Sequence, residues 1–125
     1  MSIRNLDSLF KPSSIAIIGA SERAGAIGQV VTRNILEAPS SGPVMLVNPA
    51  RRELFGRTVY ADVASLPETP ELAVICTPAE AAVKVVAELA ARGTRAAVVI
   101  AAGFAGGADS PGGRLRQALL DAARP

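Results

Sequence analysis

Residues 14–28 read Ser14-Ile15-Ala16-Ile17-Ile18-Gly19-Ala20-Ser21-Glu22-Arg23-Ala24-Gly25-Ala26-Ile27-Gly28, and the rest of the interpretation depends on this segment. The short apolar run that ends at Gly19 is typical of a strand buried on both faces. After a loop of small residues, apolar side chains recur at helical spacing from Ile27 to Glu37. The segment therefore predicts a strand, a glycine-containing loop and a helix in direct succession.

Three more apolar runs predict strands elsewhere in the chain: Val44–Asn48, Leu72–Cys76 and Ala96–Ala101. Strands that alternate with helices indicate a parallel sheet with right-handed crossovers. We expect an α/β fold, a Rossmann-like doubly wound parallel sheet in a single domain, with these four strands in the order 3-2-1-4. Since no strand follows the last predicted helix, we expect an N-terminal fragment, truncated before its last strand.

Local signals place the remaining elements. Thr77 is predicted to be the N-cap of a helix that starts at Pro78 and ends at Arg92, with Glu80 closing a capping box. The last helix is predicted over residues 114–123. The intervening residues are interpreted as a polar turn (51–56), a short extended piece (58–60) and one helical turn (62–67).

Composition excludes several kinds of site. The chain has 125 residues, no His and one Cys, so it offers no imidazole base, no His-ligated metal and no internal disulfide. A net charge of +2 and 3% aromatic residues argue against a nucleic-acid partner.

No apolar run is long enough to span a membrane, and the polar start is not a secretory signal. We expect a cytoplasmic protein, because a lone thiol fits a reducing compartment.

The glycines of the first loop suit a phosphate ligand. Gly19 allows a sharp turn, Gly25 allows close approach of the backbone to a phosphate, and Gly28 lets the helix pack near the strand. Unpaired N–H groups at a helix start attract an anion. A strand, these glycine spacings and a helix together favour nucleotide binding over a plain connection.

The end of the second strand narrows the choice of nucleotide. It reads Asn48-Pro49-Ala50-Arg51-Arg52, without the acidic residue that receives the ribose hydroxyls in an NAD site. Arginine suits a phosphate on the adenosine ribose. NADP, with its 2′-phosphate, and coenzyme A, with its 3′-phosphate, therefore both stay open at this point.

At these residues the chain resembles the N-terminal CoA-binding domain of the NDP-forming acyl-CoA synthetases. This family includes ADP-forming acetate–CoA ligases and is related to the succinyl-CoA synthetase α subunit. The similar segments run in order over nearly the whole chain: 9–21, 25–28, 47–49, 62–67, 72–79 and 97–104. Together these segments are specific, whereas the glycine loop alone would be a weak signal.

The resemblance implies coenzyme A as the cofactor and assigns no catalytic residue to this chain. It implies that the first loop contacts the CoA phosphates, that Arg51 meets the adenosine end, and that the turn at Thr77-Pro78 borders the pantetheine path. Backbone contact is implied at 100–102. The predicted CoA-binding residues are Gly19, Ala20, Ser21, Glu22, Arg23, Gly25, Ala26, Ile27, Gly28, Asn48, Pro49, Arg51, Thr77, Pro78, Ile100, Ala101 and Ala102.

The resemblance also implies a longer parent protein with downstream phosphohistidine and ATP-grasp domains. The family's histidine is absent here, so this chain is expected to bind CoA without completing the ligase reaction. An NADP-binding domain of an oxidoreductase and a CoA-sensing domain fused to a lysine acetyltransferase are the alternatives. A homo-oligomer also stays open.

Overall fold

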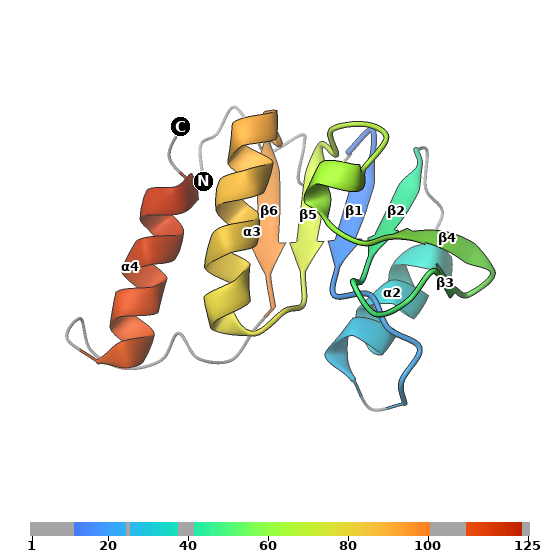
Figure 1. The fold of residues 1–125 in the computed structure, drawn as a ribbon, viewed down its shortest axis with the longest axis horizontal. Coiled ribbons are helices and arrows are strands. Elements are labelled where there is room, and N and C mark those ends of the chain that lie inside the picture. Colours follow the sequence, from blue (N-terminus) through green and yellow to red (C-terminus); the bar gives the residue numbers. More distant parts are fainter. Residues whose placement is uncertain (1–11, 25, 38–41, 101–109, 124–125) are drawn as a thin grey trace.

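The computed structural model describes residues 12–24, 26–37, 42–100 and 110–123 (Figure 1). Within these residues the chain forms one sheet in the order β3-β4-β2-β1-β5-β6. Its strands are β1 (Ile15–Ile18), β2 (Val44–Val47), β3 (Glu53–Leu54), β4 (Arg57–Tyr60), β5 (Leu72–Ile75) and β6 (Ala96–Val99). All neighbours are parallel except β3, which is antiparallel to β4. The helices are α2 (Ile27–Glu37), the 3-10 turn η2 (Val63–Ser65), α3 (Ala79–Arg92) and α4 (Pro111–Ala123).

Alternating residues of the central strands pack on the two faces of the sheet. On one face Ile18 and Ile75 pack with Leu89 of α3. On the other face Ile17 packs with Leu46 and with the half-buried side chains of α2. Figure 1 shows α3 and α4 side by side on one side of the sheet and α2 on the other. The central strands are apolar throughout because both of their faces are covered.

The Rossmann-like parallel sheet is confirmed, but the predicted strand order 3-2-1-4 is wrong. The strand over 72–75 pairs with β1 on the side opposite β2, so the four apolar strands lie in the order 2-1-3-4. The short strand β4 takes the place beside β2. The strand order still reverses beside β1, which is where a ligand crevice is expected.

Two helix starts also differ from the prediction. The N-cap of α3 is Pro78, and no side chain caps the helix, so the proposed capping box of Thr77 and Glu80 is wrong. Thr77 lies one residue too early to reach the first-turn N–H groups. The last helix begins at Pro111 rather than 114, because Ser110 caps it: its Oγ accepts the Gly113 N–H at 3.0 Å.

The segment between β2 and β5 has more structure than a polar turn. Residues 53–60 form the β3–β4 hairpin, and the predicted helical turn over 62–67 is η2. Asp62 caps η2 by accepting the Ser65 N–H at 2.9 Å, and this bond together with the Ser65 hydroxyl lowers the pKa of the Asp62 carboxyl. Among the described residues, we find no helix with the length and apolar character needed to cross a bilayer.

Candidate functional site

The carboxyl ends of three strands meet at Gly19. Gly19 ends β1 with a φ of +87°, a conformation that favours glycine. Its N–H donates to the Val47 carbonyl of β2 at 2.9 Å. On the other side, a Cβ at Gly19 would lie 3.0 Å from the Cys76 carbonyl oxygen after β5. The predicted sharp turn at Gly19 is therefore present, and it lies where the crevice of a doubly wound sheet is expected.

The loop after β1 folds back on itself before α2 begins. The Arg23 N–H donates to Ser21 Oγ at 3.0 Å, and the Ala26 N–H donates to the Arg23 carbonyl at 3.1 Å. The Ser21 hydroxyl proton is not used by this bond. Ser21 can therefore still donate to a phosphate oxygen.

Gly28 allows α2 to start against the loop. A Cβ at this position would overlap the Gly19 carbonyl oxygen, which is a backbone atom, so the loop or the helix would have to shift. This confirms close packing as the role of Gly28. At the start of α2, the Gln29 and Val30 N–H groups donate to the Ala26 carbonyl at 3.1 and 3.3 Å. The N–H groups of Ile27 and Gly28 precede these bonds and are the donors that this helix start offers to an anion. Ile27, at the helix start, is 53% exposed.

Asn48 holds the loop after β2 against the loop after β1. Its Nδ2 donates to the Ala20 carbonyl at 2.8 Å, and its Oδ1 accepts the Ala50 N–H at 2.8 Å. These two bonds use both the amide nitrogen and the amide oxygen of Asn48. Asn48 thus acts on the backbone of both loops, and the exposed residues Pro49 and Arg51 follow from a fixed turn.

A second bond between these regions was not predicted from the sequence. The Phe55 N–H, in the turn between β3 and β4, donates to Glu22 Oε1 at 2.9 Å. Phe55 and Gly56 both have positive φ, +53° and +71°, as a tight two-residue hairpin turn requires. A Phe-Gly pair is a weak version of the Asn-Gly signal for such a turn. It is the one local sign that could have revealed the hairpin.

The two loops carry an excess of positive charge. Together with the β3–β4 hairpin, they hold four arginines and two glutamates, all exposed: Arg23, Arg51, Arg52 and Arg57, and Glu22 and Glu53. Arginine binds phosphate through planar, bidentate hydrogen bonds. The edge is therefore chemically suited to an anionic ligand.

The loop after β5 differs in having an unused polar atom. Thr77 Oγ1 is buried and has no hydrogen-bond partner among the described residues, while Thr77 Cγ2 lies next to Gly19. Burial raises the pKa of the neighbouring Cys76 thiol. Cys76 is thus a protonated, half-buried side chain at neutral pH, as expected of a structural cysteine.

The last predicted segment is described only in part. The Ile100 N–H donates to the Ile75 carbonyl at 2.8 Å, which brings Ile100 to the same edge of the sheet as Cys76. The predicted contacts Gly25, Ala101 and Ala102 lie outside the described residues.

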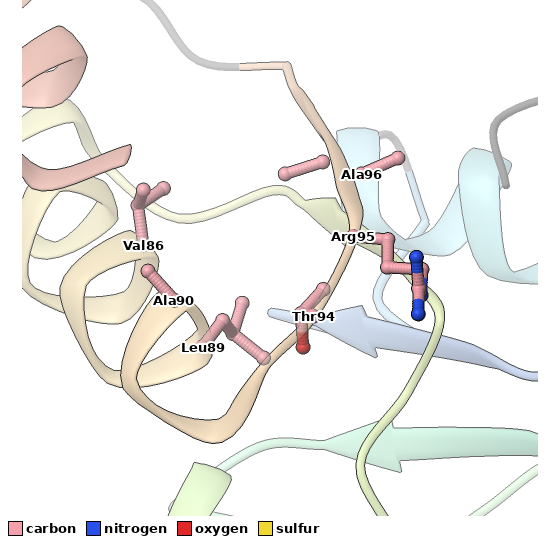
Figure 2. Close-up of a pocket in the computed structure, with 7 residues that line it drawn as sticks. Val86, Leu89, Ala90, Thr94, Arg95 and Ala96 are labelled. Carbon is pink, nitrogen blue, oxygen red and sulfur yellow. The ribbon is translucent and has the colours of Figure 1, made fainter. Parts of the chain in front are cut away.

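A shallow pocket elsewhere is not part of this site. It lies between the end of α3 and the start of β6, at the amino ends of the strands (Figure 2). Its lining is mainly aliphatic, from Val86, Leu89, Ala90, Thr94, Arg95, Ala96 and Ala97. The glycine turn, the helix start and the arginines all belong to the opposite, carboxyl end.

At the crevice edge of this parallel sheet lie a sharp turn at Gly19, a helix N-terminus and exposed arginines. These features fit a nucleotide cofactor with several phosphates. They define the class of Rossmann-like nucleotide-binding domains. The chain belongs to the CoA binding domain family, which it matches over residues 13–125. This membership supports coenzyme A as the cofactor and does not support the NADP or acetyltransferase-sensor alternatives.

Curated relatives agree with the family. The chain is 43% identical over 101 residues to a trans-feruloyl-CoA synthase from an unknown prokaryotic organism, covering 81% of this chain and 14% of the relative. It is 37% identical over 118 residues to an ADP-forming acetate–CoA ligase of Archaeoglobus fulgidus, covering 94% and 17%. The chain thus spans about one-seventh to one-sixth of these relatives. The resemblance to the N-terminal domain of NDP-forming acyl-CoA synthetases is confirmed.

Solved structures show the same fold. A protein from Pyrococcus horikoshii superimposes with a TM-score of 0.86 at 32% identity, over 94% of this chain and 27% of that one. The apo form of a dinucleotide-forming acetyl-coenzyme A synthetase from Candidatus Korarchaeum cryptofilum gives 0.82 at 33% identity, over 94% and 25%.

Proposed function

We propose that this chain is the CoA-binding module of an ADP-forming acyl-CoA ligase, and that CoA lies across the loops after β1, β2 and β5. In the complete reaction an acyl group, CoA and ATP would give acyl-CoA, ADP and phosphate. Bound CoA supplies the thiol that accepts the acyl group. This chain's own residues bind and orient the cofactor.

One observation carries the assignment of the site. The glycine turn that follows β1 and the arginine-bearing loop after β2 are held together by the 2.8 Å bond from Asn48 to the Ala20 carbonyl. Coenzyme A carries a diphosphate and a 3′-phosphate on one adenosine. The helix start and Ser21 suit the diphosphate, and Arg51 suits the 3′-phosphate.

The remaining predicted contacts follow the same edge. Thr77, Pro78 and Ile100 would border the pantetheine arm. The Thr77 hydroxyl, which is buried and has no partner among the described residues, could bond an amide of the arm once the loop moves to expose it. The phosphohistidine and ATP-grasp chemistry would come from other domains of the protein. We place the protein in the cytoplasm, where CoA and ATP are available.

Calorimetric titration tests the site. CoA should bind more tightly than dephospho-CoA and NADP, by about tenfold for one charge-assisted phosphate contact. Arg51→Ala should weaken CoA binding by a similar factor and leave dephospho-CoA binding unchanged. Arg52→Ala is the matched control, since it removes the same charge from the neighbouring position. Preference for NADP, or equal effects of both substitutions on both ligands, would contradict the proposal.

The ligase assignment needs the full-length protein. Incubation with ATP should place an acid-labile phosphate on a histidine outside residues 1–125. Acyl-CoA formation should then depend on CoA and release ADP. AMP as the product, or acyl transfer to lysine without ADP formation, would contradict it.

A further inference from the structure

Glu22 occupies an unexpected place for an acidic residue. It lies in the loop that faces the helix start, where a carboxylate would repel the phosphates of a nucleotide. Its Oε1 instead accepts the Phe55 N–H at 2.9 Å, 33 residues further along the chain. The carboxylate is therefore engaged by the β3–β4 turn, and a direct contact with phosphate is not its role.

The β3–β4 turn, which Glu22 contacts through Phe55, is also held by packing against the core. The Phe55 side chain packs against the core cluster that contains Leu54 and Val59. Its φ of +53° is uncommon for a residue with a side chain, so packing and the bond from Glu22 both support this conformation. The hairpin is thus fixed to the core at its base and to the loop after β1 through Glu22.

The hairpin in turn determines where Arg51 lies. The Arg52 carbonyl accepts the Val59 N–H at 2.9 Å, so the hairpin ladder begins one residue after Arg51. On its other side, the Asn48 side chain bonds to both Ala20 and Ala50. The short segment that carries Arg51 is therefore held at both ends to the loop after β1.

We propose that Glu22 is a positioning residue for recognition of the 3′-phosphate of CoA: through Phe55 it fixes the distance between the helix start of α2 and Arg51. This inference rests on the proposed CoA site and deepens it. Without the bond, the hairpin and Arg51 would sample a wider range of positions. The 3′-phosphate would then lose part of its contact, while dephospho-CoA, which does not use Arg51, would be little affected.

Two substitutions at Glu22 separate this bond from the effect of charge. Glu22→Gln removes the charge and keeps an acceptor oxygen, whereas Glu22→Ala removes both. Any general gain in affinity from the lost negative charge should appear in both variants. The quantity to measure is the ratio of the dissociation constants of dephospho-CoA and CoA, by calorimetry.

We expect Glu22→Gln to keep the wild-type ratio and Glu22→Ala to lower it about threefold or more, the effect of a loosened charge-assisted contact. Thermal unfolding should show that both variants fold, since Glu22 is exposed. Equal ratios in the two variants, whether both retained or both reduced, would overturn the role of the bond. Absence of CoA binding or of 3′-phosphate discrimination in the wild-type chain would instead refute the proposed function itself.

Discussion

The loops after β1 and β2 differ from the loop after β5 in how their polar groups are used. The first two are joined by side-chain bonds to backbone, from Asn48 to Ala20 and from Glu22 to Phe55. In the third, the buried Thr77 hydroxyl has no partner among the described residues. The arginine-bearing part of the site is thus held by bonds within the chain itself, which lowers the entropic cost of binding a ligand. The β5 loop instead keeps a hydroxyl buried, and a ligand could bond it only after this loop moves.

Gly28→Ala should have the largest effect on the loops after β1 and β2. The added Cβ would overlap the Gly19 carbonyl oxygen, so the loop or the helix must move. We expect a loss of about 2–3 kcal/mol in the free energy of unfolding, the usual cost of overpacking. CoA affinity should fall by about a hundredfold because the loop is displaced. Chemical denaturation and calorimetry measure the two effects.

Gly93→Ala is the control for that substitution. Gly93 has a φ of +97° but open space around its Cβ position, and it ends α3 away from the loops. It should cost about 1–2 kcal/mol of stability through backbone strain alone. Its CoA affinity should match the wild type. An equal loss of affinity in both variants would show that reduced stability, and not loop geometry, governs binding.

Asn48→Ala should separate the loops after β1 and β2. It removes two hydrogen bonds to backbone, which corresponds to about 2 kcal/mol of unfolding free energy. CoA binding should weaken along with it. Asn48→Asp keeps the acceptor for the Ala50 N–H but turns a carboxylate oxygen toward the Ala20 carbonyl in place of the donor. We therefore expect no gain in stability over Asn48→Ala and a further loss of CoA affinity from the added negative charge. If both variants bind CoA as the wild type does, CoA binding does not depend on the Asn48 bonds between the two loops.

The sequence predicted the first loop well because its signals are local. The helix over 27–37 and the buried strand before it agree with the structure, and Gly19 and Gly28 have the predicted roles. The bond between Glu22 and Phe55 could not be foreseen, since it joins residues 33 positions apart across a hairpin with a weak turn signal. The strand order failed for a related reason: β4 is short and partly polar, so its place beside β2 has no apolar signature.

Errors at the helix starts came from competing local signals. Thr77-Pro78 and Ser110-Pro111 both have the form of an N-cap followed by proline. Only Ser110 caps its helix. The glycines after Pro111 were predicted to lie in a loop, so the predicted start of the last helix came too late. In the structure their low helix propensity is outweighed by the Ser110 cap and by packing against α3.

Thr77→Val tests the loop after β5. Valine has nearly the shape of threonine, and the lost hydroxyl makes no bond among the described residues, so stability should be unchanged or rise by about 1 kcal/mol. CoA affinity should fall severalfold if the hydroxyl bonds the ligand. Thr32→Val is the matched control. Its hydroxyl is also buried and makes no hydrogen bond within the described part of the chain, but it lies inside α2, so stability should respond similarly and CoA affinity should not change. Equal affinities in the two variants would assign the Thr77 hydroxyl no ligand role.

Cys76 gives the smallest expected effect and reports on the same loop through pH. Burial raises the pKa of its thiol in the folded chain above the ordinary value of 9.0. The folded state therefore keeps the proton that the unfolded state loses, and stability falls as pH rises from the unfolded pKa to the folded one. Below that range the thiol is protonated in both states and adds no pH dependence.

Denaturation of the wild type and of Cys76→Ala between pH 7 and 10 should show a slightly steeper decline for the wild type above pH 9. Parallel curves would mean that the thiol is as well solvated in the folded chain as in the unfolded one. The β5 loop would then be more open than its half-buried cysteine indicates.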